Sequence, residues 1–477
     1  MLAAVLTVLT VLLVFFIFFF PEMTIKPRHC AVTGDVAQPL DLADCKASAY
    51  IQTLVDGKQV KALPLNALVR LSEPVSEIFS VLLAGSDGLM ARLQGDELTD
   101  CLVINNGGQW DMQASSHPVN ANIKDLSQIV VIDESADLQT GVNIISQTAN
   151  LYHMTAGGMM LQSLTRYPHL DGETRQVGAN SVRLYMQKLL LALQDTVQDP
   201  IQNILVMSRS GDCQYFTEPG YLELNQNKIN FLDADKNKTI RDIAGIIINP
   251  PSQSIMDTFG DCLHYLEKDQ PVLLIYLDGL GYHQYEEALR QGLIPNLSGC
   301  GEALRINSVW QPVTNAGFAA MVTGQSPLIN GIIDRSQREP AVLTIFDRIG
   351  PGKTHALVES DVGILKLNTK TYYNTDDNSD GRTDDEVFAR TMTLQQTDLD
   401  FLMVHFHGID DAGHDYGDLD NRTLDVLARI DRYIGLIIAA WPGKVIITAD
   451  HGMHSMEEGG DHGDFRYEDL MVPYLVF

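Results

Sequence analysis

The stretch Pro271-Val-Leu-Leu-Ile-Tyr-Leu-Asp-Gly-Leu-Gly281 gives the clearest indication of the fold. Val272–Leu277 is a continuous apolar run, which is typical of a parallel strand buried on both faces, and the Asp-Gly that follows is a turn signal. Phe401–His405 and Lys444–Thr448 have the same apolar character. These three segments predict buried strands in the C-terminal part of the chain.

Helical patterns lie between these strands, at Ala316–Thr323, Asp384–Gln395 and Thr423–Ala440. In the last of them apolar residues recur at a helical period, at Leu424, Leu427, Ile430, Ile434 and Ile437. Alternating strands and helices predict an α/β domain over residues 271–477, with a mostly parallel sheet and helices on both faces. Ligands of such sheets bind beyond the carboxyl ends of the strands.

Residues 24–268 mix short β-branched runs with turn residues and predict a β-rich region. Two of its segments resemble each other, Asn122–Ile132 and Thr239–Asn249. We interpret them as parts of two copies of one module, at residues 24–150 and 151–268. Two ordinary strand–turn–strand segments are the alternative.

Residues 2–20 carry no charge and are just long enough to cross a hydrocarbon core of ~30 Å as a helix. No Lys or Arg precedes them, and bulky residues and Pro21 follow. A single transmembrane anchor is therefore favoured over a cleaved signal peptide. Lys26 and Arg28 weakly favour a cytoplasmic location for the side that follows.

The composition is that of a globular protein, with 45% apolar and 20% charged residues in a chain of 477. Lys and Arg total 33 against 61 Asp and Glu, which gives a formal net charge of −28. So acidic a surface repels phosphate backbones, and no nucleic-acid binding is expected. Bound metal ions would still permit an anionic substrate. The six cysteines are too sparse for a disulfide scaffold.

Residues of metal-ligand type follow each predicted strand. Asp278 follows the first, Asp410 and His414 follow the second, and Asp450 and His451 follow the third. His462 comes eleven residues after His451. Carboxylates and imidazoles suit Zn²⁺ or a similar divalent ion. Because the carboxyl ends of parallel strands share one edge of a sheet, this order predicts a metal site there.

These residues in this order, with Thr314 between the first and second strands, resemble the alkaline phosphatase superfamily, in particular its type I phosphodiesterase/nucleotide pyrophosphatase branch. The resemblance covers residues 271–477. It implies an alkaline-phosphatase-like fold, two divalent metal ions, most commonly Zn²⁺, and Thr314 as a metal-activated nucleophile. It assigns one metal to Asp278, Thr314, Asp450 and His451, and the other to Asp410, His414 and His462. It also implies a catalytic domain outside the cytoplasm.

Two positions bear on the substrate. Arg335 stands where nucleotide-cleaving members carry an Asn that binds a phosphoryl oxygen, and a guanidinium would suit a more anionic group. Asn315, next to Thr314, is similar to phosphonoacetate hydrolase relatives and is a second candidate for phosphoryl binding. Residues 347–384 are the one segment that could form a small specificity cap.

The sequence thus predicts a membrane-anchored hydrolase of small phosphate esters, resembling phosphodiesterases. The alternatives on the same fold are a phosphomonoesterase, a sulfatase-like enzyme, a phosphonate hydrolase and a headgroup phosphotransferase. A non-catalytic surface-binding protein is the alternative from another class.

Overall fold

The computed structural model describes residues 29–55, 57–115, 117, 121–135, 140–165, 175–178, 181–193, 197, 200–225, 227–350 and 352–477. The anchor predicted at residues 2–20 lies outside these residues. Within the described ranges, no helix is both long and apolar enough to cross a bilayer.

The chain forms two compact units. The first comprises Met1–Ser135, Thr155–Pro168 and Gln176–Ser181, and the second comprises Ala136–Met154, His169–Arg175 and Val182–Phe477. The domain limits inferred from the sequence remain predictions.

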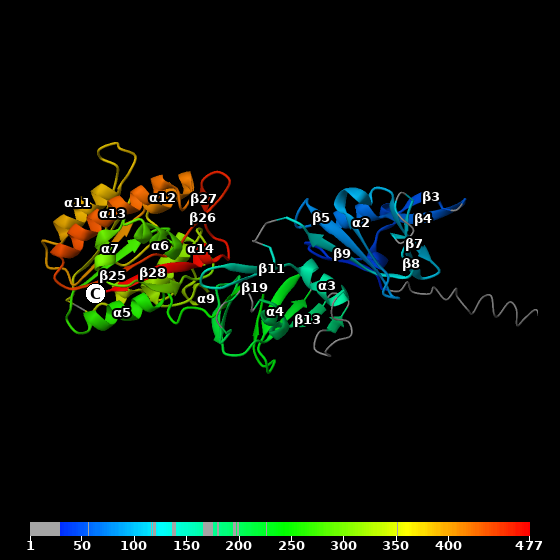
Figure 1. The fold of residues 1–477 in the computed structure, drawn as a ribbon, viewed down its shortest axis with the longest axis horizontal. Coiled ribbons are helices and arrows are strands. Elements are labelled where there is room, and N and C mark those ends of the chain that lie inside the picture. The colour runs from blue at the N-terminus through cyan, green and yellow to red at the C-terminus, as the bar shows by residue number, and fades with distance from the viewer. Residues whose placement is uncertain are drawn as a thin grey trace, which may run out of the picture. The chain divides into compact units, whose positions relative to one another are not determined.

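A seven-stranded sheet forms the core of the C-terminal region (Figure 1). Its order is β21-β28-β25-β20-β24-β22-β23, with the strands β20 (Val272–Leu277), β21 (Leu304–Asn307), β22 (His355–Ser360), β23 (Lys370–Asn374), β24 (Phe401–Phe406), β25 (Lys444–Thr448) and β28 (Met471–Val476). The five strands from β25 to β23 are parallel, and β28 runs antiparallel to both β25 and β21. The predicted mostly parallel sheet is therefore present.

Two groups of helices cover the two faces of this sheet (Figure 1). One group contains α5 (Asp257–Leu266), α8 (Thr314–Thr323), α9 (Pro327–Asn330) and α10 (Ile345–Arg348). The other contains α6 (Tyr282–Arg290), α7 (Pro295–Gly299), α11 (Asp384–Leu394), α12 (Gly408–Tyr416) and α13 (Asn421–Ala440). Short elements complete the region: β26 (His454–Ser455), β27 (Gly460–Asp461) and α14 (Tyr467–Leu470).

Helix α13 shows how the sequence pattern produces this packing. The side chain of its N-cap, Asp420, accepts a hydrogen bond from the Arg422 amide and so satisfies one free donor of the first turn. The five apolar residues that define its period are all buried, at Leu424, Leu427, Ile430, Ile434 and Ile437. They join the core of the sheet, and the opposite side of the helix faces solvent.

Part of the segment that could form a small cap, residues 347–384, belongs to the central sheet instead. Two strands of the central sheet, β22 and β23, lie within this segment and pair in parallel with each other. The interior of β22 is apolar, at Ala356, Leu357 and Val358, and all three are buried. The two strands therefore belong to the sheet, whereas residues 375–382 are mostly exposed, and a cap formed by them stays a prediction.

The first unit contains a sheet of order β2-β1-β9-β5-β6 and another of order β3-β4-β7-β8. Their strands are β1 (Ala31–Gly34), β2 (Leu40–Asp41), β3 (Ile51–Val55), β4 (Lys58–Pro64), β5 (Phe79–Gly85), β6 (Met90–Gln94), β7 (Cys101–Asn106), β8 (Gln109–Ala114) and β9 (Leu126–Asp133). The accompanying helices are η1 (Leu42–Asp44), η2 (Ala47–Ala49), α2 (Leu65–Leu71), η3 (Gly95–Leu98) and α3 (Ala156–Thr165).

The same topology recurs in residues 142–248, where a sheet has the order β11-β10-β19-β14-β15. Its strands are β10 (Val142–Ile145), β11 (Asn150–Met154), β14 (Ile204–Ser208), β15 (Cys213–Phe216) and β19 (Ile243–Ile248). A further sheet, β12-β13-β16-β17-β18, contains β12 (Arg175–Gly178), β13 (Ser181–Tyr185), β16 (Tyr221–Asn225), β17 (Lys228–Leu232) and β18 (Thr239–Ile240), and α4 (Met186–Leu193) follows β13. In each of the two matching sheets the central strand, β9 or β19, has a parallel neighbour on one side and an antiparallel neighbour on the other.

The two similar sequence segments occupy equivalent places in these sheets. Asp125 and Asp242 both precede the central strand, and both have a left-handed backbone, with φ of 50° and 51°. Each offers its carbonyl to a turn amide, from Ser86 at 2.9 Å and from Arg209 at 2.8 Å. The β5–β9 and β14–β19 pairs also carry a register shift at the same point.

Candidate active site

Five of the seven candidate ligands follow the carboxyl ends of strands of this sheet. Asp278 directly follows β20, and Asp450 and His451 follow β25. Helix α12, which follows β24, carries Asp410 and His414. The last two come from elsewhere: Thr314 is the first residue of α8, and His462 lies just after β27.

The first predicted ligand set surrounds His451. Its Nε2 lies 3.1 Å from Asp450 Oδ2, 3.5 Å from Asp278 Oδ1 and 3.3 Å from Thr314 Oγ1. All four side chains are buried. Two carboxylates, an imidazole and a hydroxyl therefore converge on one point.

The second set surrounds Asp410. His462 Nε2 lies 3.6 Å from its Oδ1, and His414 Nε2 lies 3.5 Å from its Oδ2. The rings of His451 and His462 stack at 3.8 Å between centroids, so the two sets adjoin. Asp278, Asp410 and His451 also come close enough together to share an ion.

The three histidines are oriented by their backbone contacts. In each ring Nδ1 contacts a carbonyl oxygen, of Gly460 for His414, Gly452 for His451 and Pro312 for His462. These distances are 2.9–3.0 Å, so Nδ1 donates and the lone pair is on Nε2. All three Nε2 atoms face carboxylates. Histidines that bind metals are commonly fixed in this way.

Two carboxylate oxygens without hydrogen-bond partners also indicate a cation site. Asp278 Oδ1 and Asp410 Oδ1 are buried and have no hydrogen-bond partner among the described residues. A buried carboxylate oxygen without a partner is costly, and a divalent ion would satisfy it. The donor set therefore fits two divalent ions.

The electrostatics of the side chains agree with this fit. Burial, together with the nearby Asp278, raises the pKa of Asp410 to about 7 and that of Asp450 well above its usual range. Burial lowers the pKa of His451 to about 4, which keeps its imidazole neutral. Clustered carboxylates beside the neutral imidazole of His451 form an environment in which a cation replaces protons.

The two candidate phosphoryl-binding residues differ in placement. Arg335 is exposed, but its guanidinium reaches the site, with Nη2 2.6 Å from His462 Nε2. Asn315 donates both amide hydrogens to backbone carbonyls, of Gln337 at 2.9 Å and Ile364 at 3.3 Å. Its remaining oxygen can only accept hydrogen bonds, so this geometry argues against Asn315 as a phosphoryl-binding residue.

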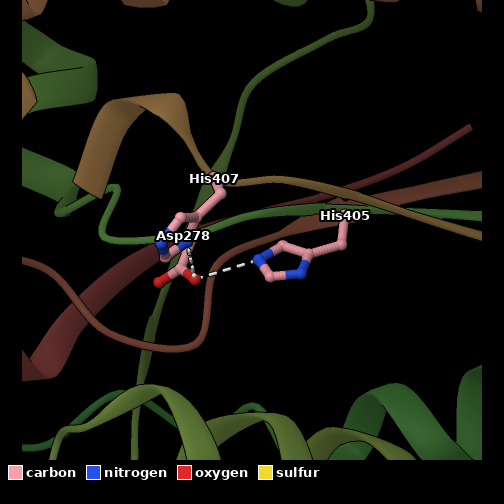
Figure 2. Close-up of side chains that lie close together, drawn as sticks. All are labelled: Asp278, His405 and His407. Carbon is pink, nitrogen blue, oxygen red and sulfur yellow. Dashed lines mark hydrogen bonds and ion pairs between the residues drawn. The ribbon is translucent and has the colours of Figure 1, made fainter. Parts of the chain in front are cut away.

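Sequence reasoning did not identify three residues beside the ligands. Figure 2 shows Asp278 between His405 and His407, whose Nε2 and Nδ1 lie 2.9 and 2.7 Å from its Oδ2. Tyr276 donates its hydroxyl hydrogen to Asp450 Oδ2 at 2.9 Å. The pattern His-x-His, which runs from the end of a buried strand into the turn that follows, was the available signal for two of them.

An α/β sheet with two such ligand sets at its carboxyl edge is typical of a two-metal hydrolase. The comparison with known families agrees: residues 351–471 match the model described as type I phosphodiesterase / nucleotide pyrophosphatase. The predicted resemblance to that branch of the alkaline phosphatase superfamily is confirmed over these residues. The match also agrees with the predicted class of enzyme, a phosphoric ester hydrolase. It includes five of the candidate ligands: Asp410, His414, Asp450, His451 and His462.

No curated protein matches the chain. Similar solved structures include phosphonoacetate hydrolase from Sinorhizobium meliloti 1021 in complex with phosphonoformate, at 20% identity and a TM-score of 0.31 over 39% of this chain and 57% of that one. Murine ectonucleotide pyrophosphatase / phosphodiesterase 5 in complex with AMP has 19% identity and a TM-score of 0.33, over 39% and 58%. The human form has 18% identity and a TM-score of 0.32, also over 39% and 58%. This chain thus spans less than two thirds of each of these proteins, and similarity this low carries no conclusion about activity.

Proposed function

We propose that the second unit is a two-metal hydrolase of phosphate esters that uses Thr314 as its nucleophile. The observation that carries the proposal is the set of three imidazoles, each fixed at Nδ1 by a carbonyl and each facing a carboxylate with Nε2. A surface-binding protein would gain nothing from burying these charged groups, because their desolvation is costly.

Asp278, Thr314, Asp450 and His451 would hold one ion, and Asp410, His414 and His462 the other. When bound, two divalent ions supply the positive charge that favours ionisation of a hydroxyl and stabilises the developing charge on a phosphoryl group. Zinc is the metal we propose, because mixed carboxylate and imidazole ligands suit it.

Two features support Thr314 as the residue that attacks phosphorus. Its Oγ1 lies among the first ligand set, and as the first residue of α8 it stands where free backbone amides favour phosphate oxygens. Attack forms a bond from Oγ1 to phosphorus and releases the alcohol of the ester. Water then cleaves the phosphothreonine, which restores the hydroxyl and releases phosphate or a phosphate monoester.

Arg335 supports a preference for a terminal, doubly charged phosphoryl or phosphonyl group over a diester. Its guanidinium lies beside His462, at the edge of the second ligand set. A planar guanidinium can donate to two oxygens of such a group, whereas an esterified oxygen accepts poorly. The phosphomonoesterase and phosphonate hydrolase alternatives therefore take precedence over the sulfatase and the phosphotransferase.

Replacement of Thr314 tests the mechanism. Thr314→Ala should keep its fold and lower the turnover of p-nitrophenyl phosphate by ~10⁴–10⁶, as for other covalent nucleophiles. Thr314→Ser should retain part of the activity because it keeps the hydroxyl. Thr323→Ala is the matched control, since its hydroxyl lies at the other end of α8, where it donates to Ala319 O and accepts from the Gln325 amide and the Asn330 side chain. A Thr314→Ala enzyme within about tenfold of the parent would refute covalent catalysis.

A paired ester assay tests the substrate class. The parent should hydrolyse p-nitrophenyl phosphate faster than its bis-ester, and a chelator should abolish both activities. Arg335→Ala should reduce the rate with the monoester more than the rate with the diester. If the parent prefers the bis-ester and Arg335→Ala leaves both rates unchanged, the enzyme is a diesterase and the proposed preference is wrong.

We also propose that residues 2–20 anchor the protein in a membrane and that the catalytic unit lies outside the cytoplasm. The uncharged apolar sequence of the segment supports anchoring. A C-terminal topology reporter should be active only outside the cytoplasm, and activity of a cytoplasmic reporter would contradict this placement.

A further inference from the structure

Three side chains contact the Oδ2 atoms of two candidate metal ligands, Asp278 and Asp450. They are His405, His407 and Tyr276, which we call the clamp. His405 is the last residue but one of β24, and His407 lies just beyond the strand as the N-cap of α12. Tyr276 is the direct partner of His405 in the neighbouring strand β20. The clamp therefore results from the register of two parallel strands and from the turn that leads from β24 into α12.

The two histidines occupy one oxygen of Asp278. Both contacts go to Oδ2, at 2.9 Å from His405 Nε2 and 2.7 Å from His407 Nδ1 (Figure 2). Oδ1 has no hydrogen-bond partner among the described residues and is the oxygen nearest His451 Nε2, at 3.5 Å. The carboxylate is thus held in one rotamer with a single free oxygen turned toward the first ligand set.

Tyr276 extends the clamp to the second carboxylate. Its ring stacks on that of His405, with centroids 4.1 Å apart and planes 6° apart. Its hydroxyl binds Asp450 Oδ2, the oxygen that lies 3.1 Å from His451 Nε2. Because one ring supports the other, the positions of Asp278 and Asp450 are linked through side chains that belong to neither ligand set.

The ring of His405 also has an acidic neighbour at its other nitrogen. It is fully buried, and its Nδ1 lies 3.6 Å from the carboxylate of Glu359, which is also fully buried at the end of β22. A residue that contributed only to packing would not need a buried carboxylate beside it, because such a charge is costly without a polar partner.

We propose that His405, His407 and Tyr276 are positioning residues that hold Asp278 and Asp450 in the geometry required by the first metal ion. The inference rests on the proposed function for the identity of the site, but its test uses metal affinity. Groups that orient metal ligands are worth ~10–100-fold in metal affinity or activity.

The test measures zinc binding to the full chain by competition with a chelating dye, together with total metal content. His407→Leu should weaken one of two zinc equivalents by about 10–100-fold, and saturating zinc should still give two equivalents. His407→Asn should restore affinity to within a few-fold of the parent, because the Asn amide replaces Nδ1 as donor. Tyr276→Phe should weaken binding in the same direction while it keeps the stacked ring.

Two matched controls separate positioning from general stability. His283→Leu removes a histidine of similar burial that contacts Asp418 at 2.6 Å, and Tyr474→Phe removes a buried hydroxyl that contacts Asp261 at 2.6 Å. Neither carboxylate is a candidate ligand, so both variants should bind zinc like the parent.

In the clamp variants, kcat should fall while KM stays unchanged.

Three results would overturn the inference. One is His407→Leu and Tyr276→Phe variants that both bind zinc within twofold of the parent. Another is permanent loss of one zinc equivalent in His407→Leu, which would make His407 a ligand. The third is a His407→Asn variant as weak as His407→Leu. Should His407→Leu fail to fold, Tyr276→Phe decides alone. A parent that binds two zinc ions but hydrolyses no ester would refute the proposed function and leave the clamp intact.

Discussion

Gly317 provides the strictest test of how α8 sets the position of the proposed nucleophile. This glycine lies one turn after Thr314, and a Cβ added to it would meet the backbone oxygen of Asp450 at 2.6 Å and the Cβ of Asp450 at 2.7 Å. Ordinary contacts begin at 3.4 Å, so Gly317→Ala must separate the helix from the turn after β25 by 3.4 − 2.6 = 0.8 Å.

The expected effect on activity exceeds the effect on stability. Overpacking costs ~1–3 kcal/mol, and the better helix propensity of Ala returns ~1 kcal/mol, which leaves a net loss of ~0–2 kcal/mol. A shift approaching 1 Å between reacting groups can lower the rate ~10²-fold. Gly317→Ala should therefore remain folded but lose about 99% of its turnover.

Urea unfolding and turnover of p-nitrophenyl phosphate at saturating zinc would measure both quantities. Gly260→Ala is the control, because Gly260 lies in α5, is exposed and has nothing within 4 Å of the added Cβ. That variant should gain ~0.5–1 kcal/mol and keep full activity. A Gly317→Ala enzyme as active as the parent would show that the contact with Asp450 does not position Thr314.

The remaining predictions concern stability. Removal of metal by a chelator should lower the unfolding midpoint, because the clustered carboxylates of the site then repel one another. Added zinc should restore the midpoint, and a midpoint that a chelator leaves unchanged would contradict a metal site. Burial raises the pKa of Asp469 to about 6 although His454 opposes this, so the folded state keeps a proton that the unfolded chain releases near pH 4. The free energy of unfolding should therefore fall as the pH rises from about 4 to about 6, and Asp469→Asn should flatten that slope in urea titrations. Ile434→Ala, at a fully buried position of α13, should cost ~2–5 kcal/mol, whereas Leu436→Ala on the exposed side of the same helix should stay within ~0.5 kcal/mol.

Much of the C-terminal fold could be predicted from local pattern. β20 and β25 have the predicted bounds, and β24 is one residue longer than predicted. These strands are apolar throughout because the sheet buries both their faces. β22 was missed because His355, Glu359 and Ser360 interrupt its apolar run, and its polar end is buried against His405.

The site was predictable where one residue type follows one strand, and unpredictable where strands must be aligned. The sequence shows an aspartate shortly after each of three apolar runs, at Asp278, Asp410 and Asp450. The contact of Tyr276 with His405 depends on the register between β20 and β24, which a single sequence does not encode locally. Arg335 reaches His462 from a loop, and loop conformation is set by the surrounding structure.

The twofold occurrence of one sheet topology creates a hazard during folding, because equivalent strands could exchange between the copies. The bulged pairings place Gln128 opposite Ala84 in one sheet and Gly245 opposite Met207 in the other, so these two positions correspond. A Cβ at Gly245 would lie 2.3 Å from the ring of Phe465. A strand that carries glutamine there cannot take the place of β19 without displacing this ring. The lack of a side chain at Gly245 therefore allows β19, and not β9, to pack against Phe465.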